Sequence, residues 1–412
     1  MSITPQPYQH IQTIGILGGG QLGMMLAESA MQLGYTCIFL EDSPNCPASR
    51  YGKVYSTQQL ADFAKHADVF TLEFENTPVK TCEWLASLSQ NVDSGSFNNH
   101  SFNSDDGKKF GMFPPPQALE VAQDRLKEKT LFNQLGIATV PFRAVDNLNE
   151  LKTACDELGL PLVLKTSRGG YDGKGQFVIQ DRADIETAWR ELGGAVTGDG
   201  NLTSTPAPLI AEGFIDFSRE VSLIATRGQD GQIRCFDLVE NDHHQGILAT
   251  TRAPAVGASH LQALAESAIT TLMTHLDYVG TLTLELFVSK DGDGKDTLLA
   301  NEIAPRVHNS GHFSIEGAVT SQFENHIRAV VGLPLGDTDN VHPSIMVNVL
   351  GEYPDLAEVL SIDGVHYHTY HKEERENRKI AHLTLMPNDV ANLEATLHNV
   401  VAVLPNKMGL DA

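Results

Sequence analysis

Residues 281–302 read TLTLELFVSKDGDGKDTLLANE and predict a β-hairpin that carries one glutamate on each strand. Apolar and polar residues alternate over 281–288, and an apolar run resumes at 297, which is typical of two strands. Asp, Gly and Lys fill the segment between them, as in a turn. The midpoint of Glu285 and Glu302 is also the midpoint of this turn. A symmetric hairpin would therefore place the two carboxylates opposite each other, with Cβ atoms about 5 Å apart.

This pair of carboxylates predicts a divalent cation. Like charges opposite each other destabilise a sheet, whereas Mg²⁺ accepts one or two carboxylates and takes its other ligands from phosphates and water. We therefore predict a Mg²⁺ (or Mn²⁺) site on Glu285 and Glu302. Asp291, Asp293 and Glu302 imitate the spacing of a calcium-binding EF-hand, but Asp296 stands where that loop needs glycine. We reject the calcium loop on that ground.

The chain continues from this hairpin into residues 301–312, which read NEIAPRVHNSGH. Besides Glu302, this segment contains the guanidinium of Arg306 and the imidazoles of His308 and His312. Buried charged and polar groups need partners. Such a mixture is therefore typical of a site that holds a metal-bound polyphosphate beside a small anion.

A phosphate-binding element is predicted around Lys165, which ends an apolar strand that begins at Leu162. The glycine-rich segment 169–175 follows, and its backbone N–H groups could fold over phosphate oxygens. A flexible hairpin tip is the alternative, since the segment does not match a Walker A loop. Glu212 and Glu220 stand where they could hold a base and a ribose, although spacing alone favours surface carboxylates.

The N-terminal segment predicts a βαβ unit and hence a parallel sheet. Gly18, Gly20 and Gly23 follow a short apolar strand, and Glu41 ends the next one, which matches the dinucleotide-binding fingerprint. Taken alone, this motif suggests NAD, whereas the alternative is a tight turn with close packing. Further predicted elements are a helix after the glycines up to Leu33, strands over 36–40 and 68–74, and one helix over 119–135.

Composition limits the classes of function. The chain has 412 residues, enough for two or three domains, and a formal net charge of −23, which argues against a nucleic-acid surface. The start of the sequence lacks a secretory signal, and no apolar stretch is long enough to cross a membrane. The five cysteines are scattered, as is usual for reduced thiols. We therefore expect a cytoplasmic protein without nucleic-acid or membrane partners.

Two further clusters have ordinary explanations. His243 and His244 are adjacent, and neighbouring residues of a strand face opposite sides, so we reject a metal site shared by the pair. The cationic run from Lys372 to Lys379 is most simply a solvated surface. It becomes a phosphate clamp if it folds back over the region of Arg306.

Together these motifs resemble the ATP-grasp carboxylate–amine ligases and, more narrowly, the N5-carboxyaminoimidazole ribonucleotide synthase family. The resemblance covers nearly the whole chain. It rests on Gly18–Gly23, Glu73–Glu75, Asp124–Leu126, Arg168–Gly175, Glu302–His312 and Arg378–His382. The basic motif at 375–379 departs from the family's usual Arg-Pro-Gly-Arg-Lys, because Glu and Asn replace Pro and Gly. Another ATP-grasp ligase, an NAD-binding protein and an inactive nucleotide sensor are the alternatives.

The resemblance implies an α/β and α+β protein of three domains. These are a Rossmann-like domain over 1–118 without NAD, an ATP-grasp domain over 119–335 with a lid at about 161–225, and a small β-rich domain over 336–412. Residues 93–113 form a long exposed loop in this scheme. The implied reaction belongs to purine biosynthesis: ATP phosphorylates bicarbonate to carboxyphosphate. This intermediate, or CO₂ released from it, then carboxylates the exocyclic amine of 5-aminoimidazole ribonucleotide. A homodimer is also implied.

The resemblance further assigns roles to individual residues. The ATP-binding residues would be Arg125, Lys165, Gly170, Tyr171, Asp172, Gly173, Lys174, Gly175, Gln176, Glu212, Gly213, Phe214, Ile215, Glu220, His243, Asn301 and Glu302. The residues around 5-aminoimidazole ribonucleotide would be Gln21, Leu22, Glu73, Tyr171, Asp172, Arg306, Lys372, Arg378 and Lys379. Arg306 and His308 would act on bicarbonate, with Lys165 on the transferred phosphate. The segment 169–175 would close as a lid.

Overall fold

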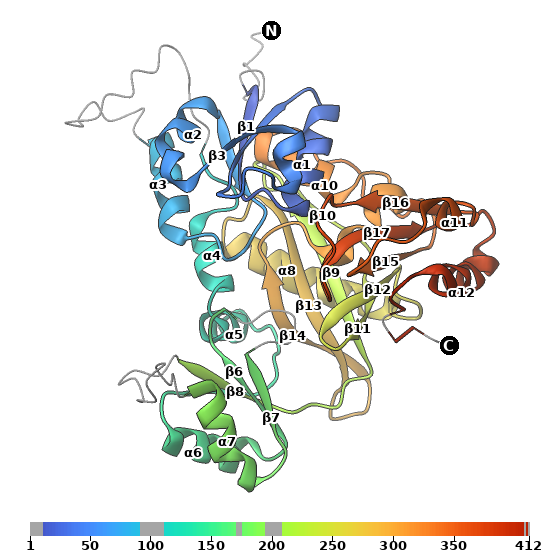
Figure 1. Ribbon diagram of the computed structural model, residues 1–412. Helices are drawn as coiled ribbons and strands as arrows, with labels where there is room; N and C mark the ends of the chain where they lie inside the picture. The colour runs from blue at the N-terminus through green and yellow to red at the C-terminus, as the bar shows by residue number, and fades with distance from the viewer. Residues whose placement is uncertain (1–10, 91–110, 170–174, 194–207, 408, 411–412) are drawn as a thin grey trace.

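The computed structural model describes residues 11–90, 111–169, 175–193, 208–407 and 409–410. In these ranges the strands form three sheets, with the N-terminal sheet at the top of Figure 1, a small sheet at the bottom and a large sheet between them that extends toward the C-terminal strands. The predicted loop over 93–113 lies outside these ranges except for its end, where Met112 bridges Phe70. No helix in the described ranges is long and apolar enough to cross a membrane.

The N-terminal sheet is parallel and has the strand order β3-β2-β1-β4, which confirms the predicted βαβ architecture. Its strands are almost wholly apolar because helices cover both faces of such a sheet. The strands are β1 (Thr13–Leu17), β2 (Thr36–Leu40), β3 (Gly52–Tyr55) and β4 (Val69–Leu72). The helices are α1 (Gln21–Gln32), α2 (Leu60–His66) and α3 (Val79–Gln90).

Two helices replace the single helix predicted over 119–135, so that prediction was wrong. They are α4 (Pro116–Ala122) and α5 (Arg125–Gln134). Asp124 separates them because its backbone is extended, and its side chain accepts hydrogen bonds from the N–H groups of Leu126 and Lys127 at 3.1 and 3.4 Å. An N-cap of this kind satisfies the free donors of a new first turn.

The small sheet is antiparallel and has the order β5-β8-β6-β7. Its strands are β5 (Phe142–Val145), β6 (Leu162–Thr166), β7 (Gln176–Ile179) and β8 (Leu209–Gly213), and α6 (Leu148–Leu158) and α7 (Ile185–Ala188) pack on it. The predicted lid range of 161–225 includes β6, β7 and β8 of this sheet. The sheet begins earlier, because β5 pairs with β8, and the next strand along the chain belongs to the large sheet.

The large sheet has nine strands in the part of the chain that the structure describes. β12 pairs with β15, so the third predicted unit continues the sheet of the second. Eight strands follow the order β14-β13-β9-β11-β12-β15-β17-β16, and β10 pairs with β9. Their bounds are β9 (Arg219–Arg227), β10 (Ile233–Cys235), β11 (Val239–His244), β12 (Ile247–Ala253), β13 (Gly280–Lys290), β14 (Asp296–Ala304), β15 (Ser344–Leu350), β16 (Val365–Thr369) and β17 (Lys379–Leu385). The helices after residue 260 are α8 (Gln262–His275), α9 (Ser314–Gly317), α10 (Gln322–Val331), α11 (Leu356–Leu360) and α12 (Leu393–Val403).

Helix α10 joins the N-terminal domain to the large sheet. Apolar residues of α1 share a core with Phe323 and Ile327 of α10. The buried ring of His326 lies between the two parts: its Nε2 is 2.7 Å from Thr71 Oγ1 on β4, and its Nδ1 accepts the N–H of Thr281 on β13 at 3.0 Å. These contacts hold the carboxyl ends of the parallel strands against the hairpin that carries the predicted site.

Candidate functional site

The hairpin of β13 and β14 places Glu285 directly opposite Glu302, which confirms the predicted pairing. The reason differs from the symmetric turn of the prediction. Near the turn, Lys290 pairs with Asp296 and Leu286 with Ala300, a register that alone would bring Asn301 opposite Glu285. A register shift after Glu285 leaves Asn301 as an extra residue on β14, as in a β-bulge, and thereby aligns the glutamates.

The two carboxylates have different environments. Burial raises the pKa of Glu285, but the His308 imidazole, whose Nε2 lies 3.0 Å from Glu285 Oε1, brings the net pKa below its usual value. Burial and the neighbouring Glu285 raise the pKa of Glu302. Arg125 Nη2 offsets this in part from 3.6 Å. The pair therefore concentrates negative charge that a cation would neutralise.

This donor set fits magnesium bound together with a polyphosphate. In the described residues no group of three or more His, Cys, Asp or Glu side chains could enclose a metal ion. Two carboxylates that leave the remaining positions to phosphate and water are what Mg²⁺ usually accepts. Glu285 and Glu302 would hold the ion.

Beside this pair, two lysines converge on the buried Glu212 at the end of β8. Lys165 Nζ on β6 donates to Glu212 Oε2 at 2.8 Å, and Lys129 Nζ on α5 lies 3.3 Å from Oε1. Burial raises the pKa of Glu212, but these ammonium groups outweigh it and lower the net pKa. The pairing of Lys165 with Glu212 joins two predicted residues. Lys129 was missed, although it lies four residues after Arg125 and so on the same face of α5.

The residues whose backbone is predicted to hold the base lie at the end of β8 and directly after it. Gly213 donates its N–H to Pro141 O at 2.9 Å, and an added Cβ would lie 3.0 Å from the Pro141 ring, so a side chain would fit poorly here. Phe214 is exposed and Ile215 half-buried. On the adjoining strands, His243 Nδ1 lies 3.1 Å from Glu220 Oε2.

The glycine-rich turn before α1 holds a side chain of the protein itself. The Glu73 carboxylate accepts hydrogen bonds from the N–H groups of Gly20 and, at 2.7 Å, Gly23. Glu41 accepts from Gly19 N–H at 3.3 Å. These carboxylates occupy the helix N-terminus where a dinucleotide would place its pyrophosphate. The interpretation of this motif as an NAD site is therefore disfavoured.

Several residues predicted to contact the ribonucleotide do lie together near this turn. Lys372 Nζ donates to Gln21 Oε1 and, at 3.4 Å, to Lys379 O. Burial and then Arg378 lower the pKa of Lys372 to about 8. Leu22 is buried in α1, and burial raises the pKa of Glu73. Lys372 of the basic run therefore contacts the N-terminal domain at Gln21, and the phosphate clamp stays a prediction.

Arg306 and His308 lie between the carboxylate pair of the hairpin and the residues near the glycine-rich turn before α1. The Arg306 Nε donates to Glu75, and Nη1 donates to Val307 O at 3.0 Å. His308 contacts Glu285 on one side and Ser310 Oγ, 2.8 Å from its Nδ1, on the other. Glu75 belongs to the motif Glu73–Glu75 and has no predicted role. Its carboxylate explains how a guanidinium can be buried here.

The predicted lid is only partly described. Gly170, Tyr171, Asp172, Gly173 and Lys174 lie outside the described residues. Gln176 begins the strand that returns beside β6 and pairs with Lys165. Directly before it, Gly175 O accepts the Thr166 N–H at 2.9 Å. The return strand therefore meets β6 at the lysine predicted to bind phosphate.

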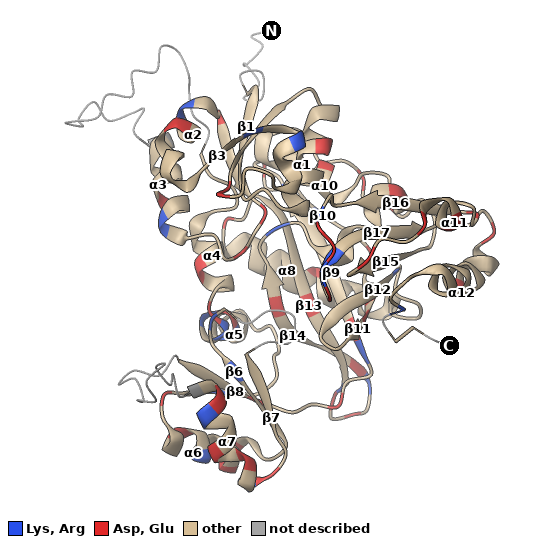
Figure 2. Ribbon diagram, viewed as in Figure 1, with Lys and Arg blue, Asp and Glu red and all other residues tan. Residues whose placement is uncertain are grey.

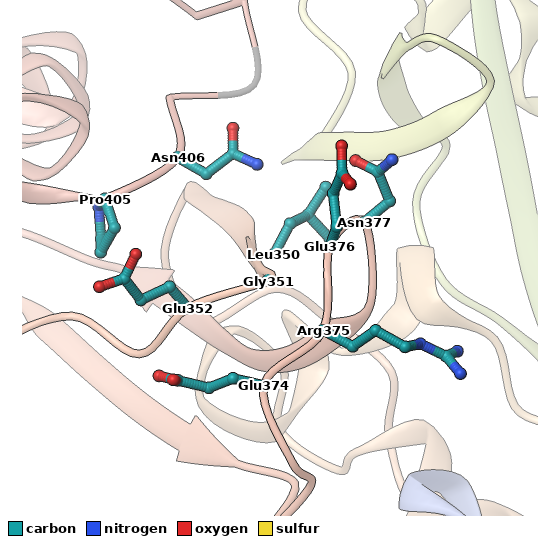
Figure 3. A pocket seen from close by; sticks show the side chains of 9 residues that line it. All are labelled: Leu350, Gly351, Glu352, Glu374, Arg375, Glu376, Asn377, Pro405 and Asn406. Atoms are coloured by element: carbon teal, nitrogen blue, oxygen red, sulfur yellow. The ribbon is translucent and has the colours of Figure 1, made fainter.

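Figure 3 shows a pocket at a different place, between the end of β15 and the segment before β17. Arg375 lines it together with three glutamates, Glu352, Glu374 and Glu376. With three carboxylates beside one guanidinium, the pocket would repel a phosphate group. In Figure 2 basic segments are likewise scattered among more numerous acidic ones, in keeping with 52 acidic and 29 basic residues.

Comparisons with known proteins agree with this geometry. Three family models match: the ribonucleotide synthetase preATP-grasp domain over residues 11–95, the ATP-grasp domain over 130–323 and the phosphoribosylaminoimidazole carboxylase C-terminal domain over 344–396. The chain is 42% identical over 399 residues to N5-carboxyaminoimidazole ribonucleotide synthase of Pseudomonas aeruginosa, covering 95% of this chain and 99% of the relative. The corresponding protein of Bacillus subtilis is 37% identical, with 90% and 91% covered.

Solved structures lead to the same family. N5-carboxyaminoimidazole ribonucleotide synthetase from Thermus thermophilus superposes with a TM-score of 0.82 at 42% identity, over 95% of this chain and 99% of that one. An Aspergillus clavatus N5-carboxyaminoimidazole synthase in complex with ADP and 5-aminoimidazole ribonucleotide gives 0.79 at 27% identity, over 96% and 98%. The similarity thus extends through all three sheets.

Proposed function

Because the chain belongs to the N5-carboxyaminoimidazole ribonucleotide synthase family, we propose that it uses ATP and bicarbonate to carboxylate the exocyclic amine of 5-aminoimidazole ribonucleotide in purine biosynthesis. One observation carries the proposal for this chain. The strand that bears Glu302 continues directly into Arg306 and His308, so the paired carboxylates and the groups for a small anion are held by one segment. The product would be N5-carboxyaminoimidazole ribonucleotide.

The nucleotide would lie along Glu212, Lys165 and the carboxylate pair. Glu212 and the backbone of the following segment would hold the base, Glu220 the ribose, and Lys165 with Arg125 the phosphates. A magnesium ion bound at Glu285 and Glu302 would neutralise charge that develops on the phosphates. Lys165 is already oriented by Glu212 and pays little conformational entropy on binding.

Bicarbonate would be held next to the terminal phosphate by Arg306 and His308. Glu75 and the carbonyl of Val307 fix the guanidinium plane, which matches the two oxygens of a small carboxylate-like anion. His308, fixed between Glu285 and Ser310, would hold the bicarbonate proton during attack on phosphorus. Carboxyphosphate formed in this position hydrolyses readily in water, which gives a closing lid over 169–175 a clear purpose.

The acceptor amine would come from the side of the N-terminal domain. Gln21, Leu22 and Glu73 would contact the aminoimidazole ribonucleotide, and Lys372 with Arg378 would bind its phosphate. The buried lysine is suited to this role because the phosphate would restore the favourable charge interaction that burial has removed. We also propose that Lys379, Tyr171 and Asp172 contact the ribonucleotide. We further propose that the protein has the three domain ranges given above, forms a homodimer and is cytoplasmic.

The direct test is to supply labelled bicarbonate with ATP, Mg²⁺ and 5-aminoimidazole ribonucleotide and to trap the labile carboxylated product. We expect one ADP for each label incorporated. ADP release that is not stimulated by the ribonucleotide would contradict the proposal and favour another ATP-grasp ligase. The control is Arg375→Gln, a basic residue in the pocket of Figure 3, which should leave the rate unchanged.

A further inference from the structure

Strand β14 is the edge strand of the large sheet, yet its backbone groups around the bulge at Asn301 are not left to solvent. Ala300 donates its N–H to Ala138 O at 2.7 Å. The Asn301 carbonyl accepts from Lys129 Nζ at 3.2 Å, and the Ile303 N–H donates to Glu128 Oε1 at 2.8 Å. Two neighbouring side chains of α5 therefore take the place of a strand on this edge.

Both side chains are buried, which is unusual for an acid and a base on a helix. Glu128 and Lys129 are each 1% exposed. Burying such groups costs several kcal/mol unless they find partners. Their partners are the backbone of β14 and the carboxylate of Glu212, which lies 3.3 Å from Lys129 Nζ. A helix that only covered the sheet would gain more from apolar residues at these positions.

We propose that Lys129 and Glu128 are positioning residues that hold the bulge at Asn301, and so set the magnesium-binding geometry of Glu302 opposite Glu285. Without the bulge, the register near the turn would place Asn301 opposite Glu285 and turn Glu302 to the other face of the strand. Lys129 also forms an ion pair with Glu212, so one ammonium group sets the base-binding carboxylate and the metal-binding strand relative to each other. This inference rests on the proposed function.

Helix α5 is suited to this task because it contacts both sheets of the ATP-grasp domain. Its first residue, Arg125, donates its backbone N–H to Ser167 O at 2.9 Å beside β6, and its guanidinium lies 3.6 Å from Glu302. Arg125, Glu128 and Lys129 are spaced i, i+3, i+4 and so share one face. The basic segment of α5 can be followed in Figure 2.

The test measures metal dependence directly, by calorimetric titration of ADP at increasing Mg²⁺. Lys129→Met should raise the Mg²⁺ concentration needed for half-maximal ADP affinity about 10- to 100-fold, the effect expected when a partner that orients a metal ligand is lost. Lys127→Met is the matched control, because Lys127 lies on the same helix but is exposed and pairs with Glu120. It should leave the Mg²⁺ midpoint unchanged. A role in stability alone would lower the melting temperature of Lys129→Met without moving that midpoint.

A second pair of variants keeps the test valid if Lys129→Met does not fold. Glu128→Gln retains an oxygen that accepts from Ile303 N–H and should keep the wild-type midpoint, whereas Glu128→Leu should shift it. An unchanged midpoint in Lys129→Met, or a shift in Glu128→Gln equal to that in Glu128→Leu, would overturn the positioning role. If the affinity of the wild type for ADP did not depend on Mg²⁺, the metal site of the proposed function would be wrong. This inference would then be wrong as well.

Discussion

Glu302→Gln should stabilise the metal-free protein while abolishing its response to magnesium. The substitution keeps the size and the acceptor oxygen of residue 302 but removes one of two charges that face each other across the hairpin. Burial and Glu285 raise the pKa of Glu302, so the folded state binds its proton more tightly than the unfolded state does. The stability that Glu302 contributes is then complete below the unfolded-state pKa and is lost as the pH rises through the folded-state pKa.

The size of the effect follows from the geometry. Two unit charges about 5 Å apart repel by about 3 kcal/mol at an effective dielectric constant of 20, and by about 0.8 kcal/mol in water. The side chain of Glu302 is 43% exposed, and His308 and Arg125 offset part of the charge. Solvent screening therefore favours the lower end. We expect a gain of about 1 kcal/mol in the free energy of unfolding at pH 7.

The assay is thermal and urea denaturation of the two proteins in metal-free buffer and with Mg²⁺ plus ADP. The variant should be the more stable without metal at pH 7. It should lose that advantage as the pH falls through the raised folded-state pKa of Glu302, and the loss should be complete below about 4, where the carboxyl group is protonated in the folded and the unfolded state. Magnesium with ADP should stabilise only the wild type strongly. Asp293→Asn in the exposed turn is the control for a lost charge on the same hairpin. A Glu302→Gln protein that is less stable at pH 7, or that responds to magnesium like the wild type, would refute the reasoning.

Three other predictions concern separate parts of the molecule. Because the pKa of Lys372 is about 8, kcat/KM for 5-aminoimidazole ribonucleotide should fall as the pH rises through about 8, and Lys372→Arg should move that decline above pH 10. A decline that stays at pH 8 in the variant would exclude Lys372 as the group responsible. His326→Ala should lower the free energy of unfolding by about 3 kcal/mol in urea, because it removes the partner of Thr71 and Thr281; a loss under 1 kcal/mol would show that this link is unimportant. Arg306→Gln should slow labelled-bicarbonate incorporation at least about 100-fold while calorimetric ADP binding stays unchanged, and weakened ADP binding would reassign the residue to the nucleotide.

The strands of the hairpin could be predicted from the sequence, but its bulge could not. Alternating residues and a turn between them predicted two strands, and the carboxylate pair followed from their spacing. The bulge that produces this pair depends on Glu128 and Lys129, which lie on a helix far from the hairpin in the sequence. Local patterns contain no information on such a contact. The correct pairing was therefore reached through a turn geometry that the protein does not have.

The buried charges were the least predictable part of the site. Charged residues on a helix are usually exposed, so the sequence alone gives no reason to separate Lys129 from Lys127. They differ because one meets Glu212 and a backbone carbonyl across the domain, and the other meets solvent and Glu120. Similarly, Glu75 becomes a partner of Arg306 only when the N-terminal sheet packs against the large one.

The glycine motif before α1 shows how one local pattern can serve two purposes. A Cβ at Gly18 would lie 2.5 Å from Glu73 Cγ, and one at Gly20 would lie 2.6 Å from Glu73 Oε1. These glycines therefore let the Glu73 carboxylate approach the backbone, much as a dinucleotide motif lets a pyrophosphate approach. The positive end of α1 is then satisfied within the protein. Glu73 becomes a fixed acceptor next to Gln21, whose amide oxygen also orients Lys372. In the Rossmann-like domain a carboxylate of the protein thus occupies the place that a dinucleotide motif leaves for a pyrophosphate.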